Sequence, residues 1–85
     1  MQQQEWIKKA IATHIFHVTK ARDNPAWKLA NTAKYLRRSI GSVSQDILIA
    51  RWLRTHEEEI KSFEFAKDAL AWIREYQRTI NLRLD

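Results

Sequence analysis

The sequence contains no cysteine, one glycine and one proline among its 85 residues. Without cysteine, the chain has neither a disulfide framework nor a thiolate metal site. β-Sheet proteins need frequent turns, which glycine and proline supply, so the scarcity of both residues favours long helices with few connections. A single glycine also excludes the glycine-rich loops that hold phosphates in nucleotide-dependent enzymes. We therefore expect an all-α protein without covalent cross-links.

Long apolar runs are also missing, and no leader segment is expected. No stretch approaches the roughly 20 apolar residues that a membrane-spanning helix needs. Residues 1–5 are polar and do not form the basic start of a signal peptide. The expected location is therefore the cytoplasm, in association with the nucleoid, or the host cytoplasm if a phage encodes the chain. No membrane partner is expected.

The residues that usually carry catalysis are absent or dispersed. No cysteine can act as a nucleophile, and no serine lies in a recognisable nucleophile elbow. The three consecutive glutamates at 57–59 would spread around a helix and could not converge on a metal. His14 and His17 share a helix face at their spacing of three, but no third ligand lies nearby. We expect no enzymatic activity, small-molecule substrate, cofactor or metal.

Apolar residues make up 45% of the chain and include four tryptophans, which suffices for one globular core. Residues 1–85 are therefore predicted to form a single domain of four helices with long N- and C-terminal helices. The predicted segments cover residues 3–21, 32–38, 42–54 and 57–82. Thr55 and Glu58 have the spacing of a capping box, which is expected to begin the last segment.

Apolar residues recur at steps of three and four and so define the face of each helix that should be buried. In the first segment these are Trp6, Ile7, Ala10, Ile11, His14, Ile15 and Val18. In the third they are Ile40, Val43, Ile47, Ala50 and either Leu53 or Arg54. In the last they are Phe63, Ala66, Ala69 or Leu70, Ile73, Tyr76 or Gln77, and Ile80. Thr13 and either Asp46 or Ile49 are expected to point toward solvent.

The two central helices are predicted to meet at a tight turn at residues 39–41. Asn31 is the expected N-cap of the helix 32–38, since its side chain accepts a hydrogen bond from the exposed first turn. Ala33 should face the next helix, because closely crossing helices need a small side chain. Gly41 is expected to supply a positive φ or a close approach of the backbone. Arg37 and Arg38 should point outward.

Residues 27–55 resemble the helix-turn-helix of plasmid-partition (ParB-type) proteins and their phage-encoded relatives. The resemblance is carried by Trp27-Lys28-Leu29, Thr32-Ala33, Leu36, Ser39, Gly41, Val43-Ser44, Asp46-Ile47 and Leu48-Ile49-Ala50. It implies a helix-turn-helix core at about 31–54, with a recognition helix at 42–53. Two positions depart from the pattern. Arg37 stands where such motifs often have glycine, and Arg38 where they often have an apolar residue.

The positive charge is concentrated around the start of this core. Residues 20–40 carry a net charge of +5, residues 1–19 of +1 and residues 41–85 of −1. Such a footprint is typical of phosphate contact, so double-stranded DNA is the expected partner. The expected phosphate-binding residues are Lys28, Lys34, Arg37, Arg38 and Ser39. By the resemblance, the expected base-reading residues are Ser42, Ser44 and Gln45, whose side chains can bond to base edges.

The predicted role is sequence-specific DNA binding, by a small transcriptional regulator or by a phage DNA-packaging or maintenance factor similar to a small terminase subunit. Phe16, Phe65 and Trp72 lie off the main apolar faces, which favours a homodimer or a higher homo-oligomer. The alternative is a helical protein-interaction module or inhibitor that binds an acidic protein partner. The sequence leaves open the DNA site, the oligomer number, the choice between regulation and packaging, and any role of His14 and His17.

Overall fold

The computed structural model describes residues 4–84, and this part of the chain is entirely helical apart from its connections. The helices are α1 (Glu5–Asp23), α2 (Leu29–Leu36), α3 (Ile40–Leu53), α4 (Glu57–Lys61) and α5 (Ala66–Leu84). The prediction of an all-α fold is confirmed, with five helices in place of four. The extra helix arises because the predicted last segment is divided into α4 and α5.

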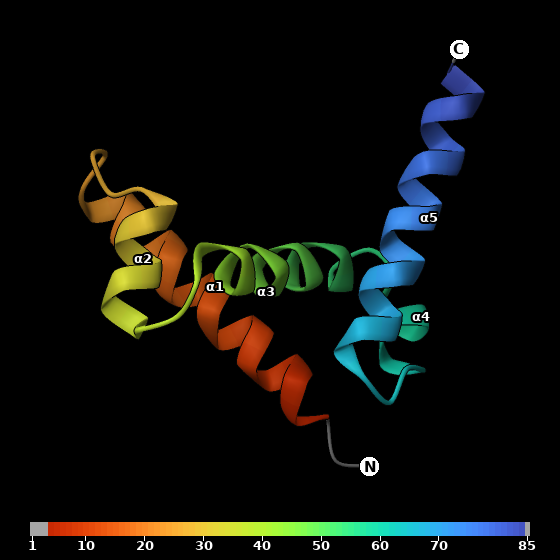
Figure 1. Cartoon of the computed structure of the whole chain (residues 1–85), viewed down its shortest axis with the longest axis horizontal. Helices are drawn as coiled ribbons and strands as arrows, with labels where there is room; N and C mark the ends of the chain where they lie inside the picture. The colour runs from red at the N-terminus through yellow and green to blue at the C-terminus, as the bar shows by residue number, and fades with distance from the viewer. Residues whose placement is uncertain (1–3, 85) are drawn as a thin grey trace.

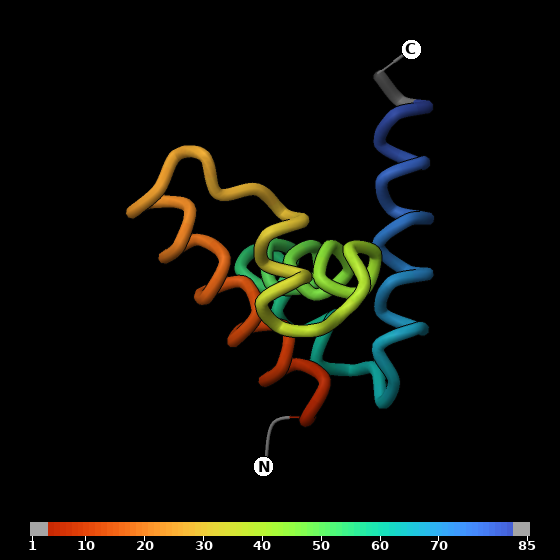
Figure 2. Tube along the Cα trace, turned by 60° about the vertical axis from the view of Figure 1, so that its left-hand side comes forward, coloured from red at the N-terminus to blue at the C-terminus, as the bar shows by residue number. Residues whose placement is uncertain are grey.

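The central element is α3, and the other helices are arranged around it (Figure 1). α1 crosses α3 and makes the most extensive contact with it, while α2 packs beside the start of α3. α4 and α5 lie at the other end of α3. Figure 2 shows that α5 runs past α3, so its C-terminal half extends away from the remaining helices. No helix in the described residues is long and apolar enough to cross a membrane.

The core lies where four of the five helices meet. Its buried residues are Ile7, Ala10, Ile49, Ile60, Ala69, Leu70 and Ile73. Trp6 reaches across from α1 and donates its indole N–H to the carbonyl oxygen of Glu64 at 2.8 Å. Burial of these side chains, at about 1.5–3 kcal/mol for each large one, holds α4 and the start of α5 against α1 and α3.

The buried face of α1 is predicted correctly only in its first half. Ile7 and Ala10 are fully buried, but Ile15 is 59% and Val18 is 38% exposed. Thr13 is buried, although it was expected to face solvent. The cause lies in the length of α1, whose last turns run beyond the core cluster and are accompanied only by α2 and the connection that follows α1.

The second helix begins earlier than predicted. α2 starts at Leu29 with Lys28 as its N-cap, and Trp27 lies in the connection that precedes it. Asn31 is therefore inside the first turn, where its side-chain oxygen accepts the backbone N–H of Lys28 at 2.7 Å. Asn31 satisfies an exposed donor from the third helical position and is not the N-cap. Ala33 is buried, as its predicted contact with α3 requires.

The turn between α2 and α3 is formed by residues 37–39 and not by 39–41. Arg37 adopts the left-handed conformation with φ 57°, the only positive φ of a non-glycine residue in the described chain. Ser39 caps α3, because its hydroxyl oxygen accepts the backbone N–H of Ser42 at 3.0 Å. Gly41 lies in the first turn of α3 without a positive φ, and Ile40, predicted as buried, is 51% exposed.

The position of Gly41 gives a direct test of this turn. A Cβ atom at residue 41 would meet no atom within 4 Å, so neither predicted reason for glycine applies. We expect Gly41→Ala to stabilise the protein by up to about 1 kcal/mol, because alanine loses less backbone freedom in a helix. Urea unfolding measures this change. A destabilised variant would show that the backbone at residue 41 needs glycine.

The two candidates for an outward-facing position in the middle of α3, one acidic and one apolar, are both buried. Asp46 is 9% and Ile49 is 1% exposed, so α3 turns a wider face toward α1 than its apolar residues alone indicated. Val43 and Ala50 are buried as predicted. A buried carboxylate needs a partner, and Asp46 has one in Arg38.

The C-terminal region differs from the predicted single helix in its N-cap and in the exposure of its last turns. His56, and not Thr55, is the N-cap of α4, and it makes no side-chain cap hydrogen bond. In α5, Ala69, Leu70 and Ile73 are buried as predicted. Further along, Ile80 is 39% exposed, because α5 has by then left the core.

Candidate nucleic-acid interface

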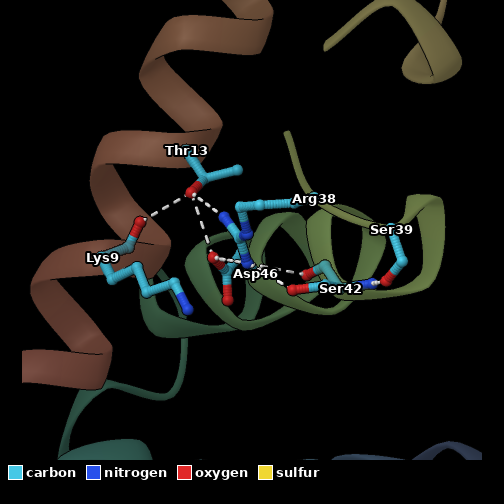
Figure 3. A network of polar contacts seen from close by, with 6 residues as sticks. All are labelled: Lys9, Thr13, Arg38, Ser39, Ser42 and Asp46. Atoms are coloured by element: carbon cyan, nitrogen blue, oxygen red, sulfur yellow. Dashed lines mark hydrogen bonds and ion pairs between the residues drawn. The ribbon is translucent and has the colours of Figure 1, made fainter. Parts of the chain in front are cut away.

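Four side chains form a network of polar contacts on the inner side of the turn between α2 and α3 (Figure 3). We call them the turn cluster: Thr13, Arg38, Ser42 and Asp46. Arg38 Nη2 lies 2.8 Å from Asp46 Oδ2 and 2.6 Å from the Ser42 hydroxyl oxygen. Arg38 Nη1 donates to the Thr13 hydroxyl at 3.0 Å, and that hydroxyl lies 3.0 Å from Asp46 Oδ2. The cluster thus joins α1, the turn and α3 through one ion pair.

The turn cluster changes the expected roles of two residues. The side chains of Arg38 and Asp46 are only 18% and 13% exposed, so the predicted outward orientation of Arg38 is wrong. Its guanidinium donates within the protein to Thr13, Ser42 and Asp46, which turns it away from the phosphate contact expected of it. Ser42 is half-buried and its hydroxyl is bound to Arg38, which limits what it can offer to a base.

The remaining predicted site residues lie at the surface. Ser44 and Gln45 are exposed on the first half of α3, one turn after the capped start of that helix. Lys34 and Arg37 are exposed at the end of α2 and in the turn that leads into α3. The structure therefore brings two hydrogen-bonding side chains and two cations to the start of α3. Lys28 is exposed at the other end of α2.

The charge around this region is not balanced by acidic side chains. Between residues 24 and 56 the sequence has one acidic residue, Asp46, which is paired inside the turn cluster. The exposed basic residues of the same stretch are Lys28, Lys34, Arg37, Arg51 and Arg54. An anion that approaches α2 and α3 consequently meets an attractive field from several cations.

A cluster of aromatic rings, which the sequence analysis did not foresee, holds one cation at the far end of α1. Lys20 Nζ lies 5.6 Å from the ring centroid of Phe16, 5.8 Å from Trp27 and 5.5 Å from Tyr35. Phe16 and Tyr35 pack with ring centroids 5.0 Å apart. This attraction ties the connection after α1 to α2. The spacing of four between Phe16 and Lys20 was the available signal.

The two histidines of α1 have separate surroundings. His17 Nδ1 lies 2.6 Å from the hydroxyl oxygen of Thr32, which also accepts the indole N–H of Trp27 at 2.7 Å. Burial lowers the pKa of His14, and the positive charges of Arg51 and Arg54 lower it further. Within residues 4–84, no group of three or more metal-ligating side chains is present.

No protein-family model, no curated protein and no solved structure matches this chain. The resemblance to ParB-type proteins therefore depends on the residues of the central segment, and any functional conclusion depends on the geometry described above. That geometry combines a capped helix start, exposed Ser44 and Gln45, and exposed cations in a segment whose one acidic side chain is paired inside the turn cluster.

Proposed function

We propose that this protein binds double-stranded DNA, with α2 and α3 acting as a helix-turn-helix and α3 as the recognition helix. One observation carries the proposal. The first half of α3 presents Ser44 and Gln45 at the surface, while the only acidic side chain of the surrounding segment is buried in an ion pair. A surface with short polar side chains and uncompensated positive charge suits the major groove of a polyanion.

The proposed contacts divide by role. Lys28, Lys34 and Arg37 neutralise phosphates, and the Ser39 hydroxyl supplements them at the start of α3. Gln45 reads a base edge, since a glutamine amide can pair with adenine through two hydrogen bonds, and Ser44 adds a shorter contact beside it. Neither contact requires Arg38 or Ser42 to leave the turn cluster, whose part is to hold α3 at a fixed angle to α2.

A second copy of the chain would place two recognition helices on one duplex. In a symmetric dimer the helices lie about 34 Å apart and read the two halves of a palindrome. The candidate surface for this pairing is the apolar edge of α5, where Tyr76 is 38% and Ile80 39% exposed. Such an assembly suits a small transcriptional regulator, and a higher homo-oligomer suits a phage packaging or maintenance factor of the small-terminase kind.

The apolar edge of α5 also motivates a second candidate function. With Trp72 beside it, this edge gives an exposed surface lined by aromatic and aliphatic residues, which is typical of protein–protein contact. The protein would then be a helical interaction module for an acidic protein partner. The two functions differ in their response to duplex DNA at low salt, because only the first requires binding.

Gln45→Ala tests the base-reading role. We expect the variant to lose about 1–3 kcal/mol of discrimination between a selected site and random duplex, because the bidentate amide contact is removed. Its affinity for random duplex should stay nearly unchanged, since phosphate contacts supply that term. Selection of a site from a pool of random duplexes, followed by fluorescence anisotropy at several salt concentrations, measures both quantities.

Two results would count against the proposal. Absence of duplex binding at 50 mM salt would favour the interaction module, because counterion release makes low salt the most favourable condition. Equal loss of specific and non-specific affinity in Gln45→Ala, without loss of folding by circular dichroism, would show that the first half of α3 does not face the bases.

A further inference from the structure

The C-terminal half of α5 rises from the side of α3 that carries the proposed base-reading residues. Leu48 is one turn beyond Ser44 on α3 and therefore shares its face. A pocket of about 240 Å³ continues this face to α5. It is lined by Leu48, Arg51, Trp52, Thr55, His56 and Gln77. Figures 1 and 2 both show α5 extending past α3 from this corner.

One edge of α5 toward this corner is polar. Arg74, Gln77 and Asn81 are spaced by three and four residues, so they share a helix face, and all three are exposed. Because Gln77 lines the pocket, Arg74 and Asn81 lie on the same side of α5, one turn before and one turn after it. Arg74 has no ion-pair partner among residues 4–84, so its charge is available.

A neighbouring edge of α5 has a different character. Trp72, Tyr76 and Ile80 line a separate pocket there together with Glu75, and the rings of Trp72 and Tyr76 pack against Trp52 of α3 with centroids 6.1 and 5.3 Å apart. Arg78 follows Arg74 by four residues and so shares its face, but it is paired with Glu75, whose two carboxylate oxygens lie 2.8 and 2.6 Å from its Nη2. The polar edge of α5 therefore offers the charge of Arg74, while that of Arg78 is neutralised.

The length of α3 brings this corner close to a bound duplex. With 14 residues, α3 is about 21 Å long, whereas the major groove is about 12 Å wide. If α3 enters the groove by its N-terminal turns, its second half lies toward the groove edge, where the phosphate backbone runs. α5 stands at that end of α3.

We propose that the corner between α3 and α5 is a second contact with the duplex, in which Arg51, Arg74, Gln77 and Asn81 bind backbone phosphates on the side of the groove away from the turn. This inference rests on the proposed function, because it requires α3 to enter the groove. Two arginines supply charge, and the two amides donate hydrogen bonds to phosphate oxygens. The duplex is thereby held at both ends of α3.

Arg74→Ala, compared with Lys8→Ala, tests the corner. Both variants remove one positive charge from an exposed position, but only Arg74 lies on α5, near the end of α3. We expect Arg74→Ala to weaken binding of a random 20-base-pair duplex about three- to tenfold at 150 mM salt. It should also lower the slope of log affinity against log salt by about one, as loss of one phosphate contact requires.

Lys8→Ala should change the affinity less than twofold, because Lys8 lies on α1, outside the α2–α3 turn and the corner. Equal weakening by both variants would overturn the proposal, since it would indicate net charge alone. An unchanged affinity of Arg74→Ala would overturn it too. If Arg37→Ala weakens binding while Arg74→Ala does not, the corner fails and the helix-turn-helix stands. If the unmodified protein does not bind, both fail.

Discussion

Asp46→Ala is expected to destabilise the protein by about 3–5 kcal/mol, the range found when one partner of a buried ion pair is removed. The variant leaves the Arg38 guanidinium largely buried without its carboxylate, and the Thr13 hydroxyl loses a partner 3.0 Å away. Domains are stable by only about 5–15 kcal/mol in total, so this change takes away a large part of the folding free energy. Partial unfolding at 25 °C is the expected result.

Urea unfolding followed by tryptophan fluorescence measures the effect. Asp68→Ala is the matched control, because Asp68 is exposed in the first turn of α5 and its loss should change the stability by less than about 1 kcal/mol. Arg38→Leu combined with Asp46→Leu should recover much of the loss, since apolar side chains can replace a buried pair. A midpoint for Asp46→Ala close to that of the control would show that the turn cluster does not stabilise the fold.

The turn cluster also shows where sequence reasoning ends. Asp46 was expected to face solvent because it lies off the apolar positions of its helix, and its burial requires a cation that can reach it. The cation is Arg38, eight residues earlier and outside any helix. The helical spacing of three and four residues relates side chains within one helix, and it gives no information about a pair formed across a turn.

The turn itself was misplaced for a related reason. Gly41 was assigned the special backbone conformation because glycine adopts it at no steric cost. The structure gives that conformation to Arg37, at the position where related motifs often have glycine. Arg37, which the sequence analysis noted as a departure from the motif, therefore marks the position of the turn. A single sequence does not show where a residue other than glycine adopts the left-handed backbone conformation.

Periodicity predicted which face of a helix is apolar, but not where its packing partner ends. Ile7 and Ala10 in α1 and Ile73 in α5 are buried as expected. Ile15 and Ile80 continue the same faces and are exposed, because α1 and α5 are longer than the core they share. Of the expected site residues in the first half of α3, Ser44 and Gln45 are at the surface, whereas the half-burial of Ser42 and the burial of Arg38 depend on tertiary contacts.

Arg37 connects stability with the proposed DNA contact, and substitution should change the two in opposite directions. A non-glycine residue in the left-handed conformation costs roughly 1–2 kcal/mol, so Arg37→Gly should stabilise the protein by about 1 kcal/mol. Arg37→Ala keeps most of that strain and should leave the stability nearly unchanged. Both variants remove the same charge, so any loss of affinity that they share reports on the charge and not on the fold.

Adding Lys34→Ala to Arg37→Gly should produce the larger effect on binding. Two phosphate contacts are removed, so the salt slope should fall by about two, and affinity for random duplex should drop roughly 10- to 100-fold at 150 mM salt. The matched control is Lys8→Ala with Lys67→Ala, two exposed lysines on α1 and α5 outside the α2–α3 segment. It changes the net charge equally. Titration by fluorescence anisotropy gives the affinities and slopes.

A comparable loss in both double variants would mean that duplex DNA responds to the overall positive charge and not to the start of α3. Undiminished affinity of the Lys34→Ala, Arg37→Gly protein would remove the phosphate contacts from the proposal. The stability of the variant distinguishes a loss of DNA contacts from a loss of folding. The Arg37→Gly change makes this variant at least as stable as the unmodified chain, so weaker binding by it cannot be attributed to unfolding.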